Sequence, residues 1–148
     1  MYGKNAHSAY QTVQITTTDR GRLLLMMYEG AIKFLKQARA GLEANDMTRF
    51  CRFLSKGQAI IAELMNTLDF EKGGTIARDL DRLYDFMLFY LTEANLRRDT
   101  ERITRVIGLI ETIYSAYKEI IEKQKDVTTA PEESAEVGEA VRRVQISL

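Results

Sequence analysis

Apolar residues return every three or four positions through most of the chain, which is the spacing of amphipathic helices. The pattern predicts four helices, over about residues 20–44, 47–68, 75–95 and 100–125. Their apolar stripes are Leu24, Met27, Ala31, Leu35, Ala38 and Leu42; Met47, Phe50, Leu54, Ile61, Leu64 and Leu68; Ile76, Leu80, Leu83, Met87, Tyr90 and Ala94; Ile103, Val106, Ile110, Ile113, Tyr117 and Ile120. Strand-like alternation is weak throughout, so the expected fold class is all-α.

Short connections between the helices favour an antiparallel arrangement. Asp19, Thr75 and Asp99 are candidate N-caps, because their side-chain oxygens can accept hydrogen bonds from the free N–H groups of a first helical turn. Gly57, inside the second helix, indicates a close helix crossing. Connections of this length predict an up-down four-helix bundle over residues 19–125.

Two segments flank the predicted bundle. Residues 1–18 form a polar, Thr-rich N-terminal arm, and residues 126–148 form a C-terminal tail that contains the only proline, Pro131. Four apolar residues of the tail lie at helical spacing and allow a short amphipathic helix: Val137, Val141, Val144 and Leu148.

The first and third helices carry more apolar residues than one stripe requires. The surplus on the third helix is Tyr84, Phe86, Leu88, Phe89 and Leu91, and on the first helix it is Leu23, Leu25, Met26 and Phe34. Either these helices are central and touch several neighbours, or part of the surplus lines a groove for an apolar segment of another protein. Composition alone favours the first interpretation.

Charge and length restrict the function classes. The chain has 148 residues, 21 basic and 21 acidic side chains, and a net charge of zero. It is therefore about one domain long and lacks the excess positive charge typical of nucleic-acid binding. No signal-peptide core and no membrane-spanning run is visible, and a single cysteine fits a reducing compartment. We expect a cytoplasmic protein without membrane insertion.

Side chains for catalysis or metal binding are scarce. His7 is the only histidine and Cys51 the only cysteine. Nucleophilic, di-iron, zinc and phosphate-loop motifs are missing. We expect Cys51 to be a small buried thiol, and Arg98, Arg102 and Arg105 to belong to a solvated, charge-paired face rather than to a basic binding stripe. The expectation is no enzyme, no cofactor and no metal.

Three motifs carry a resemblance to a known family. The stretch "ELMNTLDFEKGGTIARDLDRLYDFMLFYLTEANLRRD" (63–99), the stretch "MYEGAIKFLKQA" (27–38) and "AYQ" (9–11) resemble the flagellar secretion chaperone family FliS. The likeness covers about residues 9–121. It departs at residues 19–23, where the family usually has a Ser/Thr-Pro-Glu-Lys/Arg-Leu start.

The resemblance implies a cytoplasmic export chaperone that binds the C-terminal segment of flagellin. Such a protein prevents premature polymerisation and assists delivery to the flagellar type III export apparatus. Two rival classes remain at this point: a bundle enzyme that holds a metal or ligand, and a self-associating structural bundle. A weak homo-oligomer is also compatible with the chaperone interpretation.

The candidate contacts with flagellin, or with a docked N-terminal arm, come from the surplus residues and from the arm. They are Tyr10, Tyr84, Phe86, Leu88, Phe89 and Leu91. We expect Tyr10, with Val13 and Ile15, to dock on surplus apolar surface when no client is bound.

The segment "LDFEKGG" is expected to be a structural turn. Leu68 and Phe70 would pack at the end of the bundle and set the angle between the second and third helices. Gly73 and Gly74 would allow positive φ without a Cβ clash. A direct contact of Phe70 with flagellin is the less favoured addition.

Overall fold

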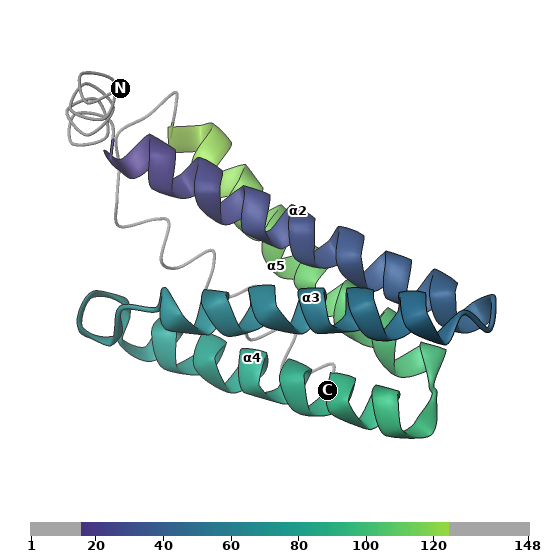
Figure 1. Ribbon diagram of the computed structural model, residues 1–148. Helices are drawn as coiled ribbons and strands as arrows, with labels where there is room; N and C mark the ends of the chain where they lie inside the picture. The colour runs from purple at the N-terminus through teal and green to yellow at the C-terminus, as the bar shows by residue number, and fades with distance from the viewer. Residues whose placement is uncertain (1–15, 125–148) are drawn as a thin grey trace, which may run out of the picture.

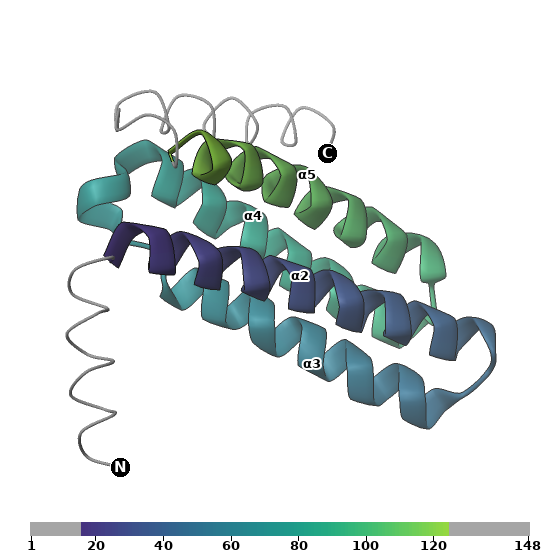
Figure 2. The same ribbon diagram turned by 90° about the horizontal axis from the view of Figure 1, so that it is seen from above.

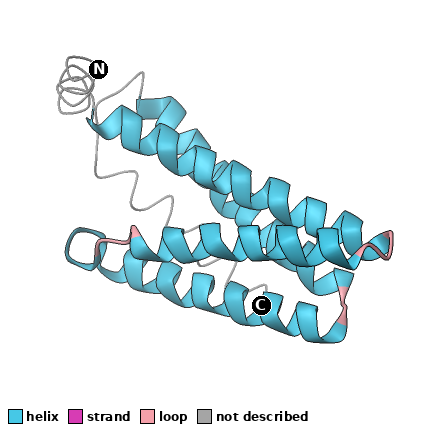
Figure 3. Ribbon diagram, viewed as in Figure 1, coloured by secondary structure: helices cyan, strands magenta, loops and turns pink. Residues whose placement is uncertain are grey.

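The computed structural model describes residues 16–124 and consists there of four helices joined by short loops (Figure 1, Figure 3). They are α2 (Thr16–Glu43), α3 (Met47–Asn66), α4 (Phe70–Arg97) and α5 (Thr100–Gln124). Each helix packs on the next, and α5 packs back on α2. The predicted all-α four-helix bundle is therefore confirmed. His7, Tyr10, Val13, Ile15 and the tail, for which predictions were made above, lie outside the described residues.

Aspartates start three of the helices. Asp46 Oδ1 accepts a hydrogen bond from Arg49 N at 3.1 Å, and Asp69 Oδ1 accepts from Glu71 N and Lys72 N at 3.1 Å. Asp99 Oδ1 accepts from Glu101 N at 2.9 Å, which confirms Asp99 as the cap of α5. These contacts satisfy N–H groups that have no partner inside the helix.

Two predicted N-caps are wrong. Thr75 is not the N-cap of α4, because α4 begins at Phe70 behind the capping Asp69; Thr75 directly follows the kink at Gly74, where the long part of α4 starts. Asp19 lies within the first turn of α2, since that helix already begins at Thr16. Its negative charge still suits the positive end of the helix dipole. The predicted boundary between arm and bundle thus falls inside α2.

The core lies along the inner faces of all four helices. It contains most of the predicted stripe positions, and its largest fully buried side chains are Tyr28, Tyr84, Phe50, Leu35, Leu54, Ile61, Leu64, Leu80, Leu83, Met87, Leu91 and Ile103. Cys51 is exposed. The prediction of a buried thiol is wrong, because Cys51 follows the inward-facing Phe50 and is turned about 100° away from it around the helix.

Small residues bring α2 and α3 close together. A Cβ atom on Gly57 would lie 2.7 Å from Leu35 Cδ2, and one on Gly41 would lie 2.7 Å from the backbone nitrogen of Phe50. The close crossing predicted at Gly57 is confirmed. Gly41 makes the tighter approach, because the neighbouring atom belongs to the backbone.

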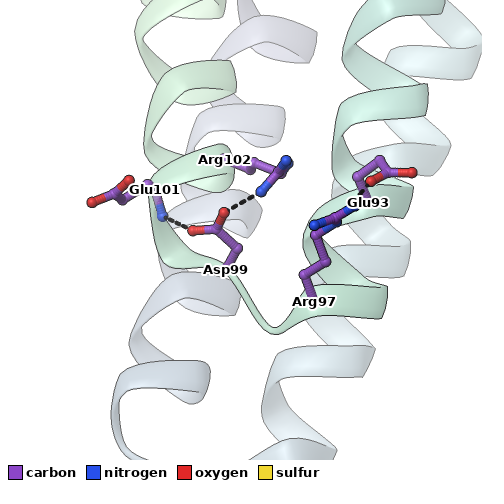
Figure 4. Close-up of polar contacts among 5 residues, drawn as sticks. All are labelled: Glu93, Arg97, Asp99, Glu101 and Arg102. Atoms are coloured by element: carbon purple, nitrogen blue, oxygen red, sulfur yellow. Dashed lines mark hydrogen bonds and ion pairs between the residues drawn. The ribbon is translucent and has the colours of Figure 1, made fainter.

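The turn from α4 to α5 is held by charged side chains (Figure 4). Arg98 ends α4 with φ 54°, and Arg97 Nε pairs with Glu93 Oε2 at 3.0 Å. The Arg102 guanidinium pairs with Asp99 and lies 5.3 Å from the centroid of the Tyr90 ring. Arg102 therefore belongs to a charge-paired surface, as expected, although its partner is the capping aspartate.

The two ends of the bundle differ in how far the helix pairs stand apart. In Figure 1 the pair α2 and α5 diverges from the pair α3 and α4 toward the end where α2 begins. Figure 2 shows the same four helices running side by side along a common axis. We call the diverging end, at the α3–α4 connection, the open end, and the end at the α2–α3 and α4–α5 turns the closed end.

Candidate functional site

A groove of about 520 Å³ lies at the open end. Its lining residues come from α2, the α3–α4 connection, α4 and α5: Arg20, Leu23, Leu24, Met27, Tyr28, Thr67, Leu68, Asp69, Gly73, Ile76, Ala77, Leu80, Tyr84 and Tyr117. Most of these side chains are apolar or aromatic. An apolar concave surface with a few polar groups is what a ligand or a peptide segment requires.

Three tyrosines form the floor of the groove. The hydroxyls of Tyr28 and Tyr84 are in direct hydrogen-bond contact between α2 and α4, and both residues are buried. The Tyr117 ring stacks on Tyr28 with centroids 5.7 Å apart. Each buried hydroxyl thus has the other as its partner, which avoids the cost of an unpaired polar group.

The hydroxyls of Tyr28 and Tyr84 stay neutral at physiological pH. Burial raises the pKa of Tyr28 well above its usual value, and the neighbouring tyrosines Tyr84 and Tyr117 raise it further. Burial also raises the pKa of Tyr84, against a smaller opposing effect of its hydrogen bond to Tyr28. A tyrosinate base is therefore excluded here, and the floor presents aromatic rings rather than charge.

The walls of the groove are apolar and incompletely buried. Leu23 is 59% exposed, and Leu24, Met27, Leu68 and Ile76 are half-buried. At the rim, Arg20 and Asp69 contribute one charge of each sign. The walls therefore offer contact area to an apolar segment with little net charge.

The start of α4 closes one side of the groove. Gly74 has φ 51° and ψ −124°, so α4 is a single turn followed by a kink and a long helix. This confirms positive φ at Gly74, a conformation that side chains with a Cβ rarely adopt. Gly73 does not have positive φ, which corrects its predicted role, but it lines the groove.

The two apolar residues of the "LDFEKGG" turn behave differently. Leu68 is half-buried, packs against the core and lines the groove. Phe70 is the first residue of α4 and is 49% exposed. The prediction that Phe70 packs at the end of the bundle is therefore wrong.

The surplus residues of α4 separate into three groups. Tyr84 and Leu91 are buried, Phe86 and Leu88 are half-buried, and Phe89 is 63% exposed. The Phe86 ring stacks on Tyr90 with centroids 5.0 Å apart. Only Tyr84 of this set lines the groove. Whether any of them contacts a client stays a prediction.

Most of the groove lining was not predicted as a site from the sequence. Tyr28 and Tyr117 were not singled out as site residues, although both lie at the floor. The surplus on the first helix was the available signal, because Leu23 belongs to it. Periodicity gives the inward face of each helix, but it does not show where two inward faces stand apart.

The described part of the chain lacks a metal-binding cluster and a membrane-spanning helix. Within residues 16–124, no group of three or more His, Cys, Asp or Glu side chains could hold a metal ion. None of the helices α2 to α5 is long and apolar enough to cross a bilayer.

Comparison with known proteins gives consistent matches. The family model described as flagellar protein FliS matches residues 3–124. A flagellar secretion chaperone FliS from Salmonella typhimurium is 38% identical over 128 residues, covering 83% of this chain and 95% of the relative. Those of Campylobacter jejuni and Bacillus subtilis are each 33% identical, over 120 and 122 residues, covering 81% and 82% of this chain and 94% and 90% of the relatives.

Proposed function

Because the chain belongs to the FliS family of flagellar secretion chaperones, we propose that it binds the C-terminal segment of flagellin in the cytoplasm before export. Binding prevents premature polymerisation and assists delivery to the flagellar type III export apparatus. The proposal involves no catalytic step, and the matched relatives are likewise named as chaperones.

The groove at the open end is the observation that carries this proposal. Leu23, Leu24 and Met27 of α2 line it together with Leu68 and Ile76, and all five remain at least partly exposed. Water-exposed apolar walls are costly unless something covers them part of the time. Met27 adds an adaptable side chain that can adjust to the surface of a client.

An amphipathic segment of flagellin would place its apolar face in this groove. The client orders as it binds, so the gain from burying apolar surface is offset by lost chain entropy. The neutral tyrosine floor and the apolar walls favour an apolar helix face over a charged peptide. Because no covalent bond forms, the export apparatus can release the client again.

The N-terminal arm is a candidate competitor for the same surface. α2 begins at Thr16, and the groove lining begins one turn later at Arg20. Tyr10 is six residues before Thr16 and can therefore lie within about 20 Å of it along an extended chain. We include in the proposal that Tyr10, with Val13 and Ile15, occupies the groove until flagellin displaces it.

Co-purification with two forms of flagellin tests the proposal. The full-length client should be retained by this chain, and a client lacking its C-terminal segment should not. Hydrogen exchange of the groove residues should slow when the full-length client is bound. Equal retention of both clients would show that the C-terminal segment is not what this chain recognises.

A further inference from the structure

A second surface lies on the outer side of the α2–α3 pair. The Phe34 ring of α2 stacks on the Phe53 ring of α3, with centroids 6.0 Å apart and planes at 27°. Lys56 Nζ lies 5.4 Å from the Phe34 centroid and 5.5 Å from the Phe53 centroid. The Arg52 guanidinium carbon lies 5.8 Å from the Phe53 centroid. We call these four residues the cation–aromatic patch.

Glycines explain why two rings meet at the surface. Gly41 and Gly57 bring the backbones of α2 and α3 so close that little volume remains between the helices. The bulkier Phe34 and Phe53 therefore lie at the outer edge of the interface, where both are only half-buried. The patch consequently lies beside the close packing of α2 against α3.

The positive charges of the patch are not neutralised by nearby acids. Neither Arg52 nor Lys56 takes part in the ion pairs identified within residues 16–124, such as those of Arg97 with Glu93 and Arg102 with Asp99. Both cations are exposed. A cation above a ring keeps most of its N–H groups available, so it can still bind a carboxylate.

The patch is also separate from the groove. None of its four residues lines the groove at the open end. Its chemistry differs too, because it combines two unpaired cations with an aromatic stack. Such a surface fits an acidic segment that carries an occasional apolar side chain.

We propose that the acidic stretch of the chain's own C-terminal tail, residues 132–139, docks on the cation–aromatic patch. That stretch reads "EESAEVGE" and contains Glu132, Glu133, Glu136 and Glu139, with no basic residue. Its only large apolar residue, Val137, can contact the rings while the carboxylates meet Arg52 and Lys56. Charge complementarity therefore selects this segment.

The length of the connecting chain permits the contact. A Cβ on Gly21 would lie 3.0 Å from Ile121, so α5 ends beside the start of α2. Phe34 is thirteen residues further along α2, about 20 Å away. Glu136 is twelve residues beyond Gln124, and an extended chain of that length reaches about 40 Å. Pro131 disfavours continuation of α5 into the acidic stretch.

Tethering compensates for the weakness of each ion pair. Exposed salt bridges contribute little individually and are screened by salt. A segment on a short tether, however, has an effective concentration in the millimolar range at the patch. We therefore expect a docked state at low ionic strength that is lost at high ionic strength.

The native cysteine provides the test. Cys51 is the only cysteine of the chain, is exposed and precedes Arg52. A nitroxide attached to Cys51 in the full-length, ¹⁵N-labelled protein should broaden the amide signals of residues 132–139 at low salt. The broadening should disappear in Arg52→Glu/Lys56→Glu. It should persist in the matched control Arg78→Glu/Arg82→Glu, which reverses two exposed charges on α4.

A charge swap makes the test specific. Converting the four glutamates of the stretch to lysine should abolish the broadening in the otherwise unchanged chain and restore it in Arg52→Glu/Lys56→Glu. Melting curves of every variant establish that the bundle is folded.

Three outcomes would overturn the proposal. The first is the absence of broadening in the unsubstituted chain at low salt. The second is broadening that survives Arg52→Glu/Lys56→Glu. The third is broadening that appears only between a labelled and an unlabelled molecule, which would assign the patch to a second copy.

Discussion

The closed end and the open end of the bundle are built from the same four helices, but α2 and α4 contribute smaller buried side chains at the closed end. At the closed end α2 carries Ala38 and Gly41, and α4 carries Ala94, all buried. At the open end the same helices contribute Tyr28 and Tyr84 to the floor of the groove. Small residues allow the helix axes to approach, whereas bulky tyrosine rings need more space between the helices.

This difference connects packing with the proposed function. The closed end is finished by caps and ion pairs, such as Asp99 with Arg102, and needs no further contact. The open end leaves Leu23 and Met27 partly exposed at the walls of the groove. One end thus supplies stability, and the other supplies the exposed apolar surface that the proposed function assigns to a client.

Truncating one core leucine at each end should have the largest effect on stability. Leu91 is fully buried in the part of α4 nearer the closed end, and Leu80 lies at the groove. Leu91→Ala should lower the free energy of unfolding by about 3–5 kcal/mol and Leu80→Ala by about 2 kcal/mol. The loss at Leu80 is smaller because side chains beside the groove can move into the space that the truncation leaves. Chemical denaturation measures both, and a larger loss at Leu80 would contradict the distinction between the ends.

Adding one methyl group at the closed end should also be costly. Gly41→Ala places a Cβ 2.7 Å from the backbone nitrogen of Phe50, which cannot move freely. We expect a loss of about 1–3 kcal/mol. Gly108→Ala is the matched control, because its Cβ meets nothing within 4 Å, and helix propensity predicts a gain of up to about 1 kcal/mol. Equal melting temperatures for the two variants would show that the closed end is not tightly packed.

The kink at the open end depends on one glycine. Gly74→Ala introduces a Cβ where φ is 51° and ψ is −124°, at a cost of about 1–3 kcal/mol. No neighbouring atom would be hit, so the cost is purely conformational. A thermal midpoint like that of the unsubstituted chain would mean that Gly74 does not have this conformation in solution.

The hydroxyl pair on the floor should be strongly non-additive. Tyr28→Phe or Tyr84→Phe alone leaves one buried hydroxyl without its partner and should cost about 1 kcal/mol or more. The double substitution removes both hydroxyls and should cost less than the sum of the single changes. Additive losses in a double-mutant cycle would show that the two hydroxyls do not interact.

The same pair predicts a loss of stability in alkali. The folded-state pKa of both tyrosines is raised above the unfolded value of about 10, so the folded chain holds these protons more tightly. Their contribution is therefore fully present below about pH 10 and declines as the pH rises through the folded-state pKa. The double variant Tyr28→Phe/Tyr84→Phe should therefore lose less stability than the unsubstituted chain as the pH rises above about 10. If the free energy of unfolding fell with pH equally steeply in both proteins, the two tyrosines would not cause the loss.

The elements of the fold followed from local signals. Apolar spacing located all four helices, Asp99 was correct as a cap, and Gly57 correctly indicated a close crossing. Each of these signals acts within one helix or between two neighbours. The prediction of Thr75 as an N-cap was wrong, because Asp69 is a stronger cap and adds one helical turn before the kink at Gly74.

The groove required information that periodicity does not contain. It forms where large side chains from three helices meet at one end of the bundle. Which side chains meet there depends on how far each helix is shifted along the bundle axis. Cys51 and Phe70 were placed inside because of their residue type, although one lies on the outer face of α3 and the other at an exposed helix start. Counting apolar residues in excess of a stripe indicated that a groove could exist, but the candidate contacts came from the surplus on α4 and not from the surplus on the N-terminal part of α2.

The most direct test of the account compares two exposed leucines by calorimetric titration with the C-terminal segment of flagellin. Leu23 lines the groove and is 59% exposed, whereas Leu96 lies outside the groove and is 76% exposed. Leu23→Asp should weaken binding at least tenfold, about 1.4 kcal/mol, and Leu96→Asp should bind like the unsubstituted chain, with both variants melting normally. Unchanged affinity in Leu23→Asp would contradict the account, and a loss of affinity in Phe89→Asp would then place the client on the outer face of α4.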